Sequence, residues 1–143
     1  MPRRGDRGRS AEIRLPARAS SPGAARRFVA KTLEGWRFAG GDDAILVVSE
    51  LVTNALLHAR TPMTVTLAED GDALRLSVTD GSMQELQQRH FSADSGTGRG
   101  LRLLASLASE WGVEWHGDGK TVWARIEPGH VAYAFDVDAI EAL

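Results

Sequence analysis

The sequence has no cysteine, which excludes disulfide bonds, thiolate metal sites and a cysteine nucleophile. It also lacks any apolar run near the roughly 18 residues that a membrane-spanning helix needs. The basic N-terminal stretch has no apolar segment behind it, so it does not have the pattern of a secretion signal. These absences predict a cytoplasmic protein that does not bind a membrane.

The composition that remains is that of one globular domain. Of 143 residues, 43% are hydrophobic and 25% are charged, which is enough for a single domain with its own core. Charge is uneven, because residues 1–37 hold ten Lys or Arg and three Asp or Glu, whereas the rest hold seven and sixteen. A basic arm attracts nucleic acid without specificity, but no aromatic residue lies among its first arginines. We therefore expect a solvated, flexible tail over residues 1–10 and no specific nucleic-acid binding.

The pattern of apolar residues predicts an α+β fold. Alternation indicates strands, and capping residues followed by a 3.6-residue period indicate helices. The order of elements implies a two-layer sandwich, with helices on one face of a mixed, mostly antiparallel sheet. The expected elements are a strand at 11–16, helices at about 21–35 and 42–59, strands at 63–68 and 73–80, a polar loop at 81–97, a helix at about 98–110, and strands at 112–116 and 120–127.

The second predicted helix carries a carboxylate and a carboxamide one turn apart. Glu50 and Asn54 are four residues apart, so their side chains lie one above the other. Such a pair is often only a solvated helix edge, but the neighbouring residues are too apolar for a plain edge. A carboxamide oxygen suits Mg²⁺, and a carboxylate can accept a proton from a nucleophile. The core stripe of this helix is expected at Ala44, Val48, Leu51, Val52 and Ala55.

Asp80 ends a predicted strand on the face that should be buried. It follows Leu76 and Val78 at alternate positions, so its side chain points the same way as theirs. A buried carboxylate needs a partner. Two alternatives stand: a local turn or helix cap at Asp80, or acceptance of a hydrogen bond from an exocyclic amine, which would select adenine. Thr121, in the last predicted strand, could support the same ring directly or through water.

A glycine-rich segment precedes the third predicted helix. Glycines at alternate positions can aim successive N–H groups at an anion, and a helix N-terminus adds its positive end. Alone this is a weak indication of phosphate binding. The segment fits neither a Walker A loop nor a dinucleotide-binding fingerprint. It reads Gly96-Thr97-Gly98-Arg99-Gly100-Leu101.

In this order and spacing, the three motifs resemble those of the histidine-kinase-like ATPase superfamily, the Bergerat fold shared by sensor kinases, gyrase B, Hsp90 and the anti-sigma-factor serine kinases. Residues 50–59 look like its N box, Asp80-Gly81-Ser82 like its first glycine box, and residues 96–101 like its second, with residues 83–95 as a short ATP lid. The resemblance covers roughly residues 11–127. It is closest to the solitary, anti-sigma-kinase-like ATP-binding proteins of actinobacteria.

The resemblance implies ATP and Mg²⁺ as cofactors and assigns a role to each motif. Asn54 would coordinate Mg²⁺, Glu50 would be the general base, and Asp80 would bind the adenine amine, with Ser82 beside it. His58 could approach a phosphate from the helix, although a surface histidine at a helix end is an equal alternative. Phosphate would be bound by the backbone of Gly96, Thr97, Gly98, Arg99, Gly100 and Leu101.

Two functions are consistent with these features. One is an anti-sigma-type kinase that phosphorylates a serine or threonine on a small antagonist (anti-anti-sigma) protein and sequesters a sigma factor. The other is a non-catalytic ATP-binding switch that controls a partner protein. Glu50 favours the kinase, whereas the short lid and Ser82, which with Gln84 stands where the superfamily has glycines, favour the switch. The resemblance also suggests a homodimer, with the ATP-binding domain over residues 11–127 and residues 128–143 as its extension.

Overall fold

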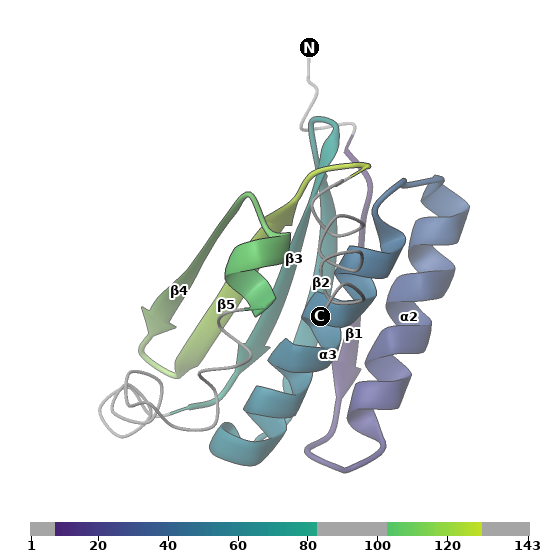
Figure 1. The fold of residues 1–143 in the computed structure, drawn as a ribbon. Helices are drawn as coiled ribbons and strands as arrows, with labels where there is room; N and C mark the ends of the chain where they lie inside the picture. Colours follow the sequence, from purple (N-terminus) through teal and green to yellow (C-terminus); the bar gives the residue numbers. More distant parts are fainter. Residues whose placement is uncertain (1–7, 83–102, 130–143) are drawn as a thin grey trace, which may run out of the picture.

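The computed structural model describes residues 8–82 and 103–129, and the fold is given for these residues. Five strands form one sheet in the order β1-β2-β3-β5-β4, and the helices cover one of its faces (Figure 1). Residues 103–107 form a further short helical segment. The named elements are β1 (Ser10–Leu15), α2 (Ser21–Trp36), α3 (Gly41–Asn54), its π-helical continuation η1 (Ala55–Ala59), β2 (Met63–Asp70), β3 (Ala73–Asp80), β4 (Glu110–His116) and β5 (Gly119–Ile126).

The sheet is antiparallel at all four of its described strand pairings, so no parallel pair of a mixed sheet occurs among them. The reason lies in the connections. Two antiparallel helices separate β1 from β2, and they return the chain to the end of the sheet at which it left β1. Leu15 therefore pairs with Met63. The other direct connections, β2–β3 and β4–β5, are hairpins. The expected α+β two-layer class is confirmed.

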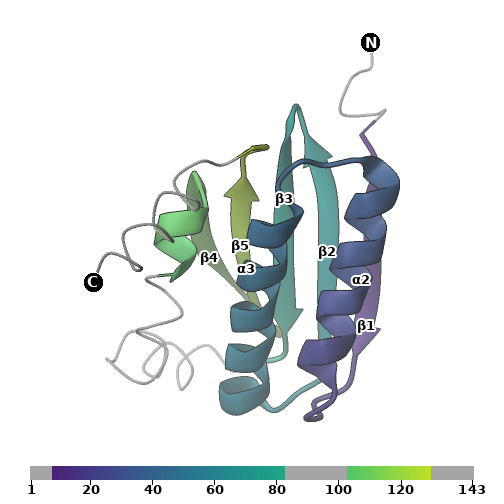
Figure 2. The same ribbon diagram turned by 45° about the vertical axis from the view of Figure 1, so that its right-hand side comes forward.

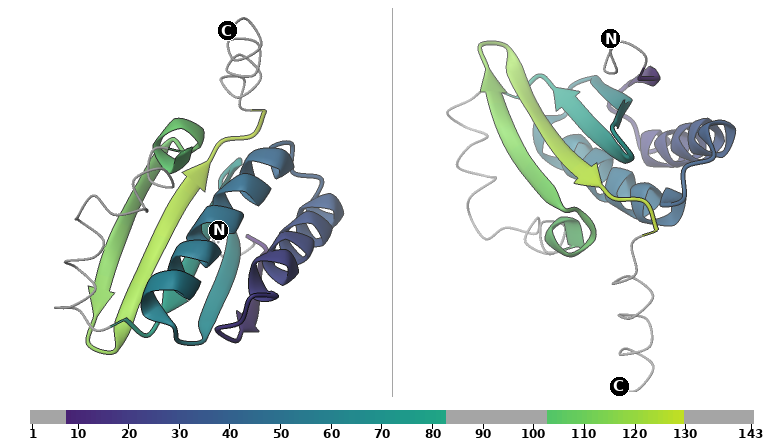
Figure 3. Two further views of the ribbon diagram at one scale, coloured as in Figure 1. Left: turned by 60° about the horizontal axis from the view of Figure 1, so that its bottom comes forward. Right: turned by 90° about the horizontal axis from the view of Figure 1, so that it is seen from above.

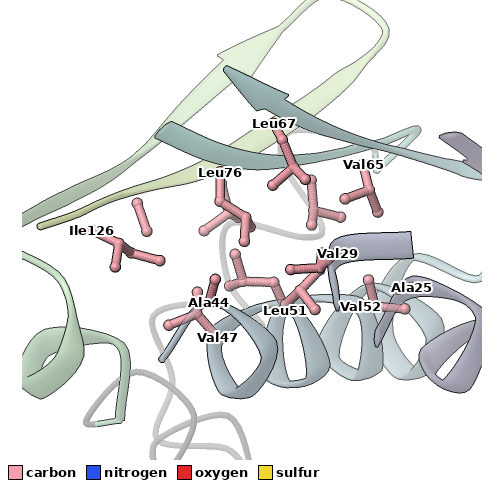
Figure 4. Close-up of a cluster of buried hydrophobic side chains, with 14 of the residues drawn as sticks. Ala25, Val29, Ala44, Val47, Leu51, Val52, Val65, Leu67, Leu76 and Ile126 are labelled. Carbon is pink, nitrogen blue, oxygen red and sulfur yellow. The ribbon is translucent and has the colours of Figure 1, made fainter. Parts of the chain in front are cut away.

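One hydrophobic core fills the space between the two layers. Figures 2 and 3 show α2 and α3 side by side on one face of the sheet. All five residues expected on the core stripe of the second helix are buried. Leu104 and Leu107 of the segment at 103–107 join the same core. Figure 4 shows how helix and strand side chains meet there, among them Val29, Val47, Leu51, Leu67, Leu76 and Ile126.

Two boundaries differ from the sequence-based expectation. The third predicted helix is described as helical only to residue 107, and β4 begins at Glu110 rather than at Gly112. Pairing with β5 explains this, because the Ser109 N–H already donates to the Arg125 carbonyl at 2.8 Å. The second predicted helix does reach Ala59, but its last turn is a π-helix, in which the Arg60 N–H donates to the Ala55 carbonyl at 3.1 Å.

The N-terminal strand begins one residue earlier than expected, at Ser10, and Arg9 before it contacts β2 and α2. The Arg9 guanidinium donates to the Glu69 carboxylate at 2.8 Å and lies 5.4 Å from the ring centroid of Trp36. The Glu69 N–H in turn donates to the Arg9 carbonyl at 2.9 Å. Arg9 therefore joins the start of β1 to the ends of α2 and β2. Within the described ranges, none of the helices has the length and apolar character needed to cross a membrane.

Candidate functional site

The motif residues that the structure describes gather at one end of the molecule. Figure 1 shows the C-terminal end of α3, the end of β3 and the β4–β5 turn at this end. Asp80, the last residue of β3, pairs with Met63 of β2 on one side and with Lys120 of β5 on the other. The Gly81 N–H donates to Thr61 Oγ1 at 2.8 Å, which ties the segment after η1 to the end of β3.

Asp80 is a buried carboxylate with three hydrogen bonds. Its side chain is only 2% exposed, as its position on the core face predicts. Oδ1 accepts from the Ser82 N–H at 2.8 Å and from the Ser82 hydroxyl at 2.5 Å, which closes a turn of the Asx type. Oδ2 accepts from Lys120 Nζ at 2.9 Å. The local turn is therefore present, and it fixes the direction of the carboxylate.

Lys120 is the residue of this site that our reading of the sequence missed. Its side chain is 6% exposed, and Nζ lies 3.3 Å from Ser82 Oγ and 5.8 Å from the ring centroid of Trp115. The signal was present in the alternation of β5, where every second residue faces the core. Lys120 stands in that series with Val122, Ala124 and Ile126. A lysine in such a series needs a buried partner.

The described part of the chain includes Thr121, which we predicted to support the base directly or through water. Successive residues of a strand point to opposite faces of the sheet, so Thr121 faces away from Asp80. Its Oγ1 lies 2.8 Å from Thr79 Oγ1 and 2.9 Å from His116 Nε2, on the face that the helices do not cover. Lys120, one residue earlier, is the residue of β5 that contacts Asp80, and the role of Thr121 stays a prediction.

Glu50 and Asn54 lie on the last turns of α3, beside the buried Leu51. Both side chains are half-buried, and neither has a hydrogen bond or ion pair within the described part of the chain. The turn that follows is the π-helix η1, which holds the half-buried His58. Single π-helical turns are rare and occur often at functional sites. The structure thus leaves the carboxylate and carboxamide available for other contacts.

Gly119 allows β5 to approach the end of β3. A Cβ at this position would lie 2.0 Å from the Asp80 carbonyl oxygen and 3.2 Å from Gly81 Cα. Gly117, in the same hairpin, has nothing within 4 Å of such a Cβ. Only glycine at position 119 is compatible with this backbone contact, which places Lys120 beside Asp80.

Other expected site residues lie outside the described residues. They are the lid at 83–95 and the phosphate-binding segment of Gly96, Thr97, Gly98, Arg99, Gly100 and Leu101. Their roles stay predictions.

A cavity of about 490 Å³ lies at the opposite end of α3 from this site. It is lined by Leu33, Phe38, Gly40, Asp43 and Ile45, among others. Because Gly41 begins α3 and Asn54 ends it, this cavity is separate from the Asp80 site. Among the residues that the structure describes, no cluster of three or more His, Asp or Glu could hold a metal ion. A Mg²⁺ ion held by one protein oxygen and by phosphates would not need such a cluster.

The chain belongs to the family of histidine kinase-like ATPase domains, whose pattern it matches over residues 15–126. That range includes Glu50, Asn54, Asp80 and Lys120. Membership in this family implies that the domain uses a nucleotide. No curated protein sequence matches the chain.

Among solved structures, the chain is similar to the RsbU and RsbW domains of Rv1364c from Mycobacterium tuberculosis, with a TM-score of 0.66 and 21% sequence identity. The match covers 83% of this chain and 32% of that one, so the chain spans about a third of the length of its structural relative. At this identity the likeness shows the fold, which agrees with the α+β sandwich described above.

Proposed function

We propose that the protein binds Mg-ATP at the Asp80 end of the sheet and acts as an anti-sigma-type serine/threonine kinase on a small antagonist protein. The observation that carries the nucleotide assignment is the buried carboxylate of Asp80 in a histidine kinase-like ATPase domain. A carboxylate offers about four acceptor positions. Ser82 fills two and Lys120 fills one, which leaves one position on Oδ2 for an amine of the base.

The carboxamide oxygen at the end of α3 suits the metal and phosphate part of Mg-ATP. Asn54 supplies one neutral oxygen, which suits a Mg²⁺ ion that takes its other ligands from phosphates and water. The bound ion would neutralise negative charge on the phosphates. We assign phosphate binding to residues 96–101, and we propose that His58 approaches a phosphate from the helix. These roles follow from the motif resemblance.

Glu50 is the proposed general base. It would take the proton of the antagonist's serine or threonine hydroxyl as that oxygen forms a bond to the γ-phosphorus and the bond to ADP breaks. The half-buried carboxylate has no hydrogen bond or ion pair to a described residue, so it is available for this proton. We further propose a sigma factor as the second partner and a homodimer as the assembly, both from the resemblance to anti-sigma-factor kinases.

The alternative is an ATP-binding switch without phosphotransfer. It is favoured by Ser82, whose N–H and hydroxyl both bind Asp80 at a position where the superfamily has a glycine. Incubation with γ-labelled ATP and candidate antagonist proteins separates the two functions. The kinase predicts label on a serine or threonine of the antagonist. ATP binding without transfer to any candidate would favour the switch.

A further inference from the structure

Thr61 is restrained by the residues on either side of it. Arg60, directly after η1, has a left-handed backbone with a φ of 57°, and Pro62 follows Thr61. A residue before proline is restricted to extended conformations, and a β-branched side chain has few rotamers. The Thr61 hydroxyl therefore has little freedom to turn away from its partner.

The Thr61 hydroxyl extends the sheet beyond its last backbone pair. The pairing of β2 with β3 ends at Met63 and Asp80, and Pro62 has no N–H with which to continue it. One position further on, the Gly81 N–H donates to Thr61 Oγ1 at 2.8 Å. A Cβ on Gly81 would lie 3.4 Å from the same oxygen, so the two residues are in close contact. A side chain thus fixes the first residue after β3.

The turn that Thr61 holds carries the carboxylate of Asp80. Oδ1 of Asp80 accepts from the N–H and the hydroxyl of Ser82. Asp80 therefore closes the turn from inside, and Thr61 holds it from outside through Gly81. Oδ2 accepts from Lys120 and retains one acceptor position, which we assigned above to an amine of the base. The direction of this position depends on the turn.

We propose that Thr61 is a positioning residue for recognition of the base, whose hydroxyl holds the turn at Gly81 so that Oδ2 of Asp80 is aimed at the exocyclic amine. This inference rests on the proposed function, since it concerns the same site. In this role Thr61 acts through Asp80 rather than on the nucleotide. Because Thr61 follows η1, which continues α3, it also joins the helix that carries Asn54 to the turn that carries Asp80.

An analogue without the exocyclic amine separates a positioning role from a purely structural one. Purine riboside triphosphate is ATP without this amine, so the ratio of its dissociation constant to that of ATP measures recognition of the amine alone. We measure both ligands with Mg²⁺ by calorimetry, for the wild type and for three variants of Thr61. Thr61→Val and Thr61→Ala lack the hydroxyl, the first with the shape of threonine and the second with no atom that could clash, whereas Thr61→Ser keeps the hydroxyl. Thr66→Val, at a half-buried position of β2, is the matched control.

We expect the wild type to bind ATP about tenfold or more tightly than the analogue, since hydrogen bonds to charged groups are the stronger ones. Loss of the Thr61 hydroxyl should lower this ratio about three- to tenfold, the worth of one neutral hydrogen bond, while the affinity for the analogue stays within about twofold. Thr61→Ser and Thr66→Val should keep the wild-type ratio.

Three results would overturn the inference and leave the proposed function standing. One is a wild-type ratio in Thr61→Val and Thr61→Ala. Another is an equal loss of affinity for ATP and the analogue, which would show a structural role only. The third is a ratio lowered as much in Thr61→Ser, which would mean that the hydroxyl is not the cause. A wild type that binds neither ligand, or both equally, would instead contradict the proposed recognition of adenine by Asp80, and the inference with it.

Discussion

At the scale of the residue, Glu50 and Asn54 allow binding and chemistry to be separated. Glu50→Gln keeps the shape of the side chain but removes its ability to accept a proton. We expect ATP affinity to stay within a few-fold and phosphotransfer to fall by roughly 10²–10⁴, the usual range for a general base. Labelled-ATP transfer and calorimetry on the same preparations measure both. Glu34→Gln, at an exposed position on α2, is the matched control.

Asn54→Ala, unlike Glu50→Gln, should weaken nucleotide binding itself. Loss of the carboxamide oxygen removes a proposed Mg²⁺ ligand, so the affinity for Mg-ATP itself should fall, while binding measured without Mg²⁺ should change little. Titration of ATP with and without the ion gives both values. Wild-type affinity for Mg-ATP in Asn54→Ala would exclude this residue as a ligand.

Gly119 gives a prediction about stability at the same site. Gly119→Ala places a Cβ against the Asp80 carbonyl oxygen, so β5 and β3 must separate locally. We expect a loss of about 1–3 kcal/mol in the free energy of unfolding, as for other overpacked sites. Gly117→Ala, in the same hairpin with open space around its Cβ, should cost much less. Denaturant unfolding of both variants makes the comparison, and equal losses would contradict the contact.

At the scale of the element, the sequence predicted what depends on local periodicity. The strand that ends at Asp80 and the core stripe of α3 follow from alternation and from the helical period, and both are confirmed. The contact of Lys120 with Asp80 was missed, and Thr121 lies on the opposite face of β5, because a shift of one residue along a strand exchanges its two faces. The π-helical turn η1 could not be predicted, since it depends on one hydrogen bond rather than on a residue pattern.

The contact between the start of β1 and the end of β2 gives a prediction about pH. The Arg9 guanidinium, through its hydrogen bond to the carboxylate, holds the pKa of Glu69 below its usual range. A carboxyl whose pKa is lowered by folding stabilises the protein above its unfolded pKa of about 4.3, and this contribution is lost as the pH falls through the folded value. The effect should be modest, because the pair is partly exposed and screened by salt.

Glu69→Gln tests this contact. The variant should be less stable than the wild type at neutral pH, and the difference should shrink as the pH falls below about 4.3, where the wild-type carboxyl also becomes protonated. Urea unfolding midpoints at a series of pH values give the difference directly. A difference that does not change with pH would mean that the Arg9–Glu69 contact does not depend on the charge of Glu69.

At the scale of the whole molecule, the fold brings together motifs that are far apart in the sequence. Asn54, Asp80 and Lys120 come from α3, β3 and β5, and the antiparallel order of the sheet places the ends of these elements at one end of the molecule. The sequence indicated Asn54 and Asp80 because each breaks a local pattern. It did not reveal the ion pair, because the contact between Asp80 and Lys120, which are 40 positions apart in the sequence, depends on strand order.

The central claim is that this end of the molecule binds an adenine nucleotide through Asp80. The most direct test is calorimetry with ATP, with and without Mg²⁺, for the wild type, Asp80→Asn and the exposed control Asp118→Asn. We predict Mg²⁺-dependent ATP binding by the wild type and the control, and a loss of about tenfold or more in Asp80→Asn, because an acceptor-only group becomes a mixed one. Absence of ATP binding by the wild type, or unchanged affinity in Asp80→Asn, would contradict the claim.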